Sequence, residues 1–181
     1  MHKVAKLIGI SLLVLGLAAC DGNTKDSATA STQAGQQVSL LGGNLEFTLP
    51  AGMADQTSKL EKPANNMHAY ADSTSQRAVI VILGDKTADS LETLAQRLEN
   101  NQRANDANLQ LITNKAIDVD GVPLRQLDSI VTNSGKKAYS SILVGALNNN
   151  LLTIQISLPA DNQQQAQTEA EGIISTLKLK Q

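Results

Sequence analysis

Alternating apolar and polar residues in the second half of the chain predict four consecutive β-strands. Turn-forming sequences separate the apolar stretches at residues 120–121 (Asp-Gly), 134–135 (Ser-Gly) and 148–150 (Asn-Asn-Asn). Strands joined by such tight turns pair with their neighbours, so the pattern predicts an antiparallel sheet. The four strands are expected at roughly residues 109–119, 122–132, 138–147 and 151–158.

Two further hairpins are predicted in the first half of the chain. The first joins strands at 38–41 and 45–49 through Gly42-Gly43-Asn44, where glycine permits the positive φ of a tight turn. The second joins strands at 67–71 and 78–83. The last of these strands reads AVIVIL, and such an unbroken apolar run is typical of a strand that is covered on both faces.

Two amphipathic helices accompany these strands. The first begins at Asp89-Ser90-Leu91-Glu92, which is similar to a capping box, and continues to about Arg103. Asp161 is a candidate cap for the second helix, and a short strand is expected after it at 177–180. Apolar residues follow helical spacing on one side of each helix: Leu91, Leu94, Ala95 and Leu98 in the first, and Ala166, Ala170, Ile173, Ile174 and Leu177 in the second.

The two narrow apolar stripes determine the expected architecture. A helix that is apolar on one side only buries that side against another layer and leaves the other side in water. The sequence therefore predicts an α+β fold, with helices flanking an antiparallel β-sheet, in a single globular domain over residues 38–181.

The first nineteen residues have a different pattern. Lys3 and Lys6 precede an uncharged apolar run at 7–19, which is the pattern of a signal peptide. The run is shorter than the roughly 20 apolar residues that a membrane-spanning helix requires. We therefore expect residues 1–19 to be removed.

The cleavage region carries a more specific motif. Leu17-Ala18-Ala19-Cys20 resembles the lipobox of bacterial lipoproteins, which predicts cleavage between Ala19 and Cys20 and acylation of the Cys20 sulfur. The alternative is an ordinary secretory signal that happens to contain a cysteine. Asp21 resembles the signal that retains such lipoproteins in the inner membrane. Residues 20–37 then form a lipidated N-terminus and a flexible linker, since 21–37 contain no large apolar side chain.

Charge and aromatic content exclude some binding partners. Loss of the signal peptide removes two of the 15 basic residues and none of the 17 acidic ones, which leaves a net charge of −4. Nucleic-acid binding requires clustered Lys and Arg and, for single strands, aromatic platforms. The chain has one Phe, two Tyr and no Trp, so no nucleic-acid binding is expected.

The residues available for catalysis are few. His2 leaves with the signal peptide and Cys20 carries lipid, so His68 is the only histidine that remains, and a zinc site of His and Cys cannot be assembled within the chain. A triad of His68, Asp72 and a serine stays open, and with it the alternative of a small hydrolase or ligand-carrier domain that uses His68. No catalytic residue, cofactor or metal site is predicted.

Three other motifs are interpreted as turns. Gly84-Asp85-Lys86-Thr87 follows a strand but lacks the glycines of a phosphate-binding loop. Asp118 and Asp120 could form a weak calcium site, although Asp-Gly at 120–121 is more typical of a hairpin turn. Lys136-Lys137 indicates a solvated hairpin that could touch anionic lipid.

Several strand and turn segments, together with the lipobox and Asp21, form a recognisable pattern: ANNMH (64–68), AVIVILGD (78–85), LITNKAI (111–117), QLDSI (126–130), AYSSILVG (138–145) and LLTIQISLPAD (151–161). On these segments the chain resembles, across essentially its full length, the DcrB family of enterobacterial inner-membrane lipoproteins. The resemblance implies a PsbP-like α/β/α sandwich, a palmitate-bearing anchor, a position on the periplasmic side of the inner membrane, and a role in phage adsorption or DNA uptake. It assigns no active site.

Together these features predict a non-enzymatic envelope lipoprotein that acts as a binding or assembly module. Its expected partners are the membrane, through the lipid anchor, and envelope proteins that the sequence does not identify. A homodimer is a further possibility, because exposed edge strands in a hairpin-rich domain can pair or exchange between chains.

Overall fold

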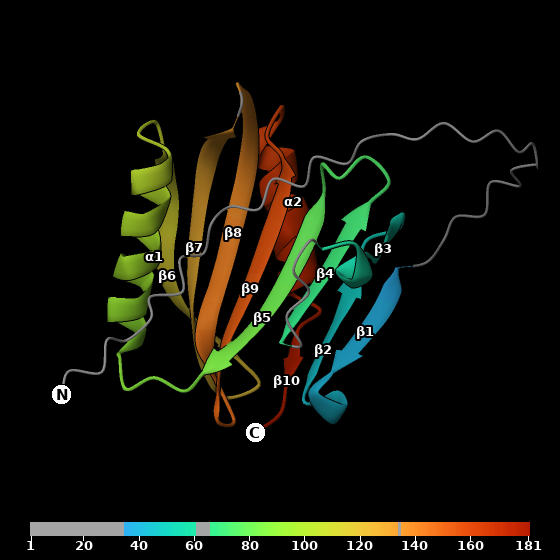
Figure 1. The fold of residues 1–181 in the computed structure, drawn as a ribbon, viewed down its shortest axis with the longest axis vertical. Helices are drawn as coiled ribbons and strands as arrows, with labels where there is room; N and C mark the ends of the chain where they lie inside the picture. The colour runs from blue at the N-terminus through green and yellow to red at the C-terminus, as the bar shows by residue number, and fades with distance from the viewer. Residues whose placement is uncertain (1–34, 61–65, 134) are drawn as a thin grey trace, which may run out of the picture.

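The computed structural model describes residues 35–60, 66–133 and 135–181. The predicted signal peptide, Cys20 and Asp21 lie outside these residues. Two β-sheets and two α-helices make up the described part of the chain (Figure 1).

The larger sheet has seven antiparallel strands and contains the predicted four-strand meander. The order across the sheet is β3-β4-β5-β9-β8-β7-β6, so the second hairpin pairs with the last strand of the meander. The bounds are β3 Met53–Asp55, β4 Met67–Asp72, β5 Ala78–Asp85, β6 Gln110–Val119, β7 Val122–Asn133, β8 Lys136–Leu147 and β9 Asn150–Pro159.

The first hairpin forms a separate, three-stranded sheet. Its strands are β1 Gln36–Leu40 and β2 Leu45–Leu49, and the predicted C-terminal strand, β10 Lys178–Leu179, pairs with β2. Leu45, Phe47 and Leu49 alternate along β2 and are fully buried, as expected for a strand with one face in the core.

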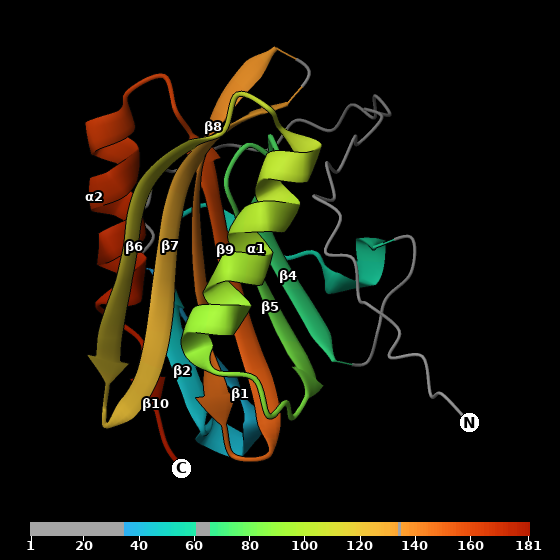
Figure 2. The same ribbon diagram turned by 90° about the vertical axis from the view of Figure 1, so that its left-hand side faces the viewer.

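The helices lie on opposite faces of the large sheet (Figures 1 and 2). Helix α1, Leu91–Asn105, packs over β7 and β8 on what we call the α1 face. Helix α2, Gln163–Ile174, and the small sheet cover the opposite face, which we call the α2 face. This arrangement confirms the predicted α+β class with helices on both sides of an antiparallel sheet.

The main hydrophobic core lies on the α2 face. Val79 and Val81 of β5 point into it and are fully buried, as are Ile154 and Ile156, which pair with them on β9. Phe47 of the small sheet meets Tyr70 of β4 edge to face, with ring centroids 5.8 Å apart. The two sheets are therefore joined by apolar side chains.

Close packing on this face requires a glycine in β8. A Cβ at Gly145 would overlap the Leu124 side chain of β7 and lie 2.9 Å from the carbonyl oxygen of Pro123. Ala146, the next residue, points to the α1 face and is exposed.

The predicted helices are confirmed, with differences at their ends. Ser90 is the N-cap of α1 and accepts a hydrogen bond from the backbone N–H of Thr93. The N-cap of α2 is Asn162, whose side chain accepts from Gln165 N–H, and the predicted cap Asp161 is wrong by one residue. Both Asp and Asn suit this position, so the sequence alone could not separate them.

The prediction that the AVIVIL strand is covered on both faces is wrong for one face. Val79 and Val81 are buried, whereas Ile80 and Ile82 on the α1 face are only half-buried. The main contacts of α1 are with β7 and β8 instead of β5. Ile80 and Ile82 therefore remain partly exposed on the α1 face.

Candidate functional site

A group of polar side chains lies between the large sheet and α2, most of them buried and Glu171 partly exposed, and we call it the inner polar cluster. Gln126 and Asp128 belong to β7, Tyr139 and Ser141 to β8, and Glu171 to α2. The alternation of side chains along each strand directs residues 126, 128, 139 and 141 to the same face, and pairing of Asp128 with Ser141 brings the two strands' polar groups together.

Hydrogen bonds join this cluster into one network. The Ser141 hydroxyl donates to Asp128 Oδ1 at 2.6 Å. The amide nitrogen of Gln126 lies 2.9 Å from Asp128 Oδ2 and 3.2 Å from Oδ1, and it also donates to Glu171 Oε1 at 3.0 Å. One amide group thus bridges two carboxylates and fastens α2 to the sheet.

Lys115 supplies a positive charge at the solvent-exposed edge of this network. Lys115 of β6 is 3.4 Å from Glu171 Oε1, and the side chains of Lys115 and Glu171 are 48% and 40% exposed. Asp128, in contrast, is completely buried, and none of the ion pairs between described residues includes it. A buried carboxylate is costly unless a cation or several hydrogen bonds offset its desolvation.

Two buried oxygen atoms of the cluster have no hydrogen-bond partner among the described residues. They are the hydroxyl of Tyr139 and the amide oxygen of Gln126, and both residues are at least 99% buried. Burial raises the pKa of Tyr139 far above its usual value, and the charge of the Asp128 carboxylate, the contact of the phenol with that carboxylate and the charge of Glu171 raise it further. The phenol thus stays protonated beside the Asp128 carboxylate, although the two make no hydrogen bond of regular geometry.

A second polar group lies directly behind the first, on the α1 face. Ser129 donates to the amide oxygen of Gln102 at 3.4 Å, and the Gln102 amide nitrogen lies 3.5 Å from the Ser140 hydroxyl. All three residues are buried, and none carries charge. We call this the outer polar cluster, and its long hydrogen bonds attach α1 to β7 and β8.

The structure does not assemble the triad of His68, Asp72 and a serine that the sequence left open as an alternative. Asp72 ends β4, and its Oδ1 accepts from the backbone N–H groups of Thr74 and Gln76, both at 3.1 Å. His68 pairs with Val81 in the middle of the hairpin, four residues earlier, which corresponds to about 13 Å along a strand. Asp72 is therefore a turn residue, and His68 lacks this carboxylate as an orienting partner.

The carboxylates of the β6–β7 hairpin are used by the backbone. Asp118 accepts from Gly121 N–H at 2.8 Å, and Asp120 accepts from Leu179 N–H at 3.1 Å. Asp120 and Gly121 have φ values of 53° and 82°, as expected for an Asp-Gly hairpin. These residues join the turn to the C-terminal strand, and Lys136 and Lys137 lie exposed at the β7–β8 hairpin, at the other end of β7.

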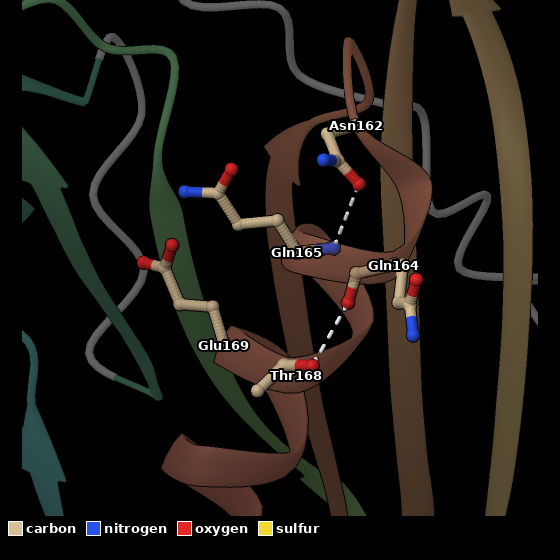
Figure 3. Close-up of a pocket in the computed structure, with 5 residues that line it drawn as sticks. All are labelled: Asn162, Gln164, Gln165, Thr168 and Glu169. Atoms are coloured by element: carbon tan, nitrogen blue, oxygen red, sulfur yellow. Dashed lines mark hydrogen bonds between the residues drawn. The ribbon is translucent and has the colours of Figure 1, made fainter.

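The outer surface of α2 carries a shallow polar depression (Figure 3). Within it, Thr168 donates to the carbonyl of Gln164 at 2.9 Å, and Gln165 and Glu169 extend from the helix towards β5. Glu169 pairs with Arg77 at the start of β5. A similar depression on α1 is lined by Glu92, Thr93, Gln96, Arg97 and Asn100. Both are open helix surfaces with amide and charged side chains.

Two further features concern the described part of the chain. No helix there is long and apolar enough to cross a membrane. No three side chains of His, Cys, Asp or Glu gather there in the manner of a metal site built from these residues alone. The inner polar cluster has two carboxylates and is completed by hydroxyl and amide groups.

Sequence analysis did not identify this cluster. Asp128 and Ser141, in the segments QLDSI and AYSSI, occupy core-facing positions of β7 and β8 at which apolar residues such as Leu124, Ile130 and Leu143 are also found. A polar residue at a core-facing position of a strand is a detectable signal, since the alternation of the neighbours shows which face it occupies.

Comparison with known proteins identifies relatives of this chain. The family model described as DcrB matches residues 44–176. The curated protein "Inner membrane lipoprotein DcrB" of Shigella flexneri is 51% identical, and the match covers 99% of this chain and all of that protein.

Solved structures extend the similarity in fold alone. Cyanobacterial PsbP from Synechocystis has a TM-score of 0.65 at 14% identity, with 88% of this chain and 100% of that chain covered. The Ran-binding protein Mog1p of Saccharomyces cerevisiae has a TM-score of 0.58 at 15% identity, with 81% and 95% covered. The sandwich inferred from the resemblance is confirmed by both.

Proposed function

Because this chain belongs to the DcrB family, we propose that its folded domain is a non-enzymatic module that binds or assembles with other proteins of the bacterial envelope. The chain is an inner-membrane lipoprotein, as its 51% identical relative is. Such a protein acts where its anchor holds it, and the domain supplies the contact surface.

One observation supports this proposal most strongly. The α1 face of the large sheet carries four half-buried apolar side chains on three adjacent strands, while the main contacts of α1 are with β7 and β8. We call them the outer strip: Met67, Ile80, Ile82 and Leu151. In the sheet Met67 pairs with Ile82, and Leu151 pairs with Gly84, so the strip is continuous. Apolar side chains on both faces of a strand favour cover on both faces.

Site-directed photo-crosslinking in cells tests this surface. A crosslinking residue at Ile82 should capture discrete envelope proteins, whereas the same residue at Thr168, exposed on α2, should capture none above background. A second substitution, Ile80→Glu, should remove the Ile82 adducts without lowering the amount of protein in the membrane. Equal capture from both positions would contradict the proposal. An adduct with twice the mass of the chain would identify the partner as a second copy.

The anchor forms the second part of the proposal. We place the lipid on Cys20, with residues 1–19 removed, Asp21 as the retention signal and the domain on the periplasmic side. Cys20→Ser should release the protein from the membrane fraction. Asp21→Ser should leave it lipidated but move it to the outer membrane. Mass spectrometry that found Cys20 unmodified would refute this placement.

The role in phage adsorption or DNA uptake comes from the family resemblance. We propose that the module takes part in this process through a partner bound at the outer strip. Deletion of the gene should reduce phage DNA entry, the wild-type chain should restore it, and Ile82→Glu should fail to do so. If Ile82→Glu restored phage DNA entry while the variant was present in the membrane at the normal level, the outer strip would not be needed for this process.

A further inference from the structure

The inner polar cluster contains buried oxygen atoms that are not needed to attach α2 to the sheet. A single hydrogen-bonded bridge, from Gln126 to Glu171, already holds α2. Beside it lie a fully buried carboxylate, Asp128, the Gln126 amide oxygen, which has no partner, and the Tyr139 hydroxyl, whose contact with Asp128 lacks regular hydrogen-bond geometry. Each unpartnered buried polar atom normally costs free energy, so its presence in a well-packed core points to a ligand.

The chemistry of these groups indicates which ligand they suit. The cluster presents two carboxylates, the hydroxyls of Ser141 and Tyr139, and the amide oxygen of Gln126, and no sulfur or imidazole. Oxygen donors of this kind bind hard cations. Ca²⁺ takes six to eight of them in an irregular arrangement, whereas Mg²⁺ requires a near-ideal octahedron.

We propose that the inner polar cluster is a Ca²⁺ site, with Asp128 and Glu171 as its charged ligands. The ion would lie between β7, β8 and α2, where it neutralises the buried Asp128 carboxylate and gives the Tyr139 hydroxyl a partner. Ser141 completes the site from β8. This site is on the opposite face of the sheet from the outer strip, and it does not depend on the function proposed for that strip.

Gln126 and Lys115 give the site two alternative states. Without the ion, the Gln126 amide nitrogen satisfies both carboxylates, and Lys115 neutralises part of the charge of Glu171. Rotation of the amide group by half a turn presents its oxygen, which now lacks a partner, to a cation instead. Lys115 lies at the exposed edge and can swing away from Glu171. The ion thus competes with an internal hydrogen bond and an internal ammonium group.

Tyrosine-sensitised luminescence of Tb³⁺, which substitutes for Ca²⁺, tests the proposal on the lipid-anchored chain purified in detergent. The chain has two tyrosines and no tryptophan. Tyr139 is the tyrosine that lies in the cluster, so it is the one expected to sensitise an ion bound there. We expect emission that excess Ca²⁺ abolishes. Tyr70→Phe is the matched control and should keep the emission, whereas Asp128→Asn and Glu171→Gln should lose it.

A thermal shift gives a readout that needs no tyrosine. Ca²⁺ at about a hundred times its Kd should raise Tm by roughly 5–10 °C. Tyr139→Phe should lose the Tb³⁺ emission but keep a Ca²⁺-dependent rise, and Lys115→Gln should bind Ca²⁺ several-fold more tightly because the competing ammonium is gone. Glu171 is half-exposed, so Glu171→Gln provides a test that does not disturb the buried core.

Three results would overturn the site. The first is the absence of both Tb³⁺ emission and a Ca²⁺-dependent rise in Tm, which would indicate that internal water, and not an ion, binds the unpaired oxygens. The second is emission that survives in Asp128→Asn and Glu171→Gln, which would place the ion elsewhere. The third is weaker Ca²⁺ binding in Lys115→Gln, since the proposal requires the opposite.

Discussion

The same short stretches of β7 and β8 place polar side chains on both faces of the large sheet, but the two groups differ in kind. On the α1 face, Gln102, Ser129 and Ser140 are neutral and satisfy one another. On the α2 face, Asp128 is charged and buried, the contact of the Tyr139 hydroxyl with it lacks regular hydrogen-bond geometry, and the Gln126 amide oxygen has no partner. A neutral network is sufficient to attach a helix. The excess charge and the unpaired oxygen on the α2 face therefore call for an explanation beyond attachment.

The two faces also differ in how completely their apolar side chains are covered. The α2 face packs against a helix and a second sheet, and Phe47, Tyr139 and Leu143 are completely buried there. The α1 face has one helix over two strands, and the outer strip beside it stays half-buried. One face is thus the core of the domain, and the other leaves apolar surface for a partner.

Truncation of a large apolar side chain should affect the two faces very differently. Phe47→Ala removes a fully buried ring that contacts Tyr70, and it should destabilise the domain by about 4 kcal/mol. Leu151→Ala in the outer strip should cost about 1 kcal/mol or less, because this side chain is already partly in solvent. Urea unfolding of both variants measures the difference. Equal losses would show that the outer strip is part of the core.

A side chain added to β8 should show the same asymmetry. Gly145→Val points to the α2 face, where the new atoms would overlap Leu124 and Pro123, and it should cost about 3 kcal/mol. Ala146→Val points to the exposed α1 side and should change the free energy of unfolding by less than about 0.5 kcal/mol. Thermal denaturation compares the pair. A stable Gly145→Val variant would mean that β7 and β8 pack less closely than described.

Removal of the outer polar cluster should have an intermediate effect. Gln102→Ala leaves the hydroxyls of Ser129 and Ser140 buried without a side-chain partner, which should cost about 1–2 kcal/mol. Restoration of stability by the triple change of Gln102, Ser129 and Ser140 to apolar residues would support an attachment role for this cluster. If neither Gln102→Ala nor the triple variant changed the free energy of unfolding, these long hydrogen bonds would contribute nothing to stability.

Alkaline pH should affect stability through Tyr139. Its pKa in the folded protein is raised above the unfolded value of about 10, so the folded state holds the proton longer than the unfolded state. The contribution is complete below pH 10 and declines as pH rises further, with a slope of up to about 1.4 kcal/mol per pH unit. Burial and Asp55 raise the pKa of Tyr70 in the same direction. Tyr139→Phe should therefore flatten the decline, and an unchanged slope would show that Tyr139 ionises freely in the folded state.

The elements of this fold could be predicted more fully than their arrangement. Local signals, such as Asp-Gly at 120–121 and the alternation along 122–132, predicted the meander and the second hairpin correctly. Pairing between distant segments is not encoded locally. The β1–β2 hairpin therefore could not be assigned to a separate sheet with β10, and the short strand β3 was missed altogether.

The candidate site shows the same limit. The polarity of Asp128 and Ser141 is visible in the sequence, but their proximity depends on the β7–β8 register, and Glu171 joins them only because α2 crosses that point. The AVIVIL segment was misread for a related reason. Its apolar residues show that both faces avoid water, but not whether the second face is covered by this chain or by a partner.

Cysteine labelling at Ile82 tests the central claim, that the outer strip binds a partner in the envelope, most directly. The only cysteine of the chain is Cys20, so Ile82→Cys and Thr168→Cys each introduce a single free thiol once Cys20 is acylated. We expect the thiol at position 82 to react with a small maleimide in the purified lipoprotein but to be protected in intact cells, while the thiol at 168 reacts in both. Equal reactivity of position 82 in cells and in the purified protein would contradict this claim.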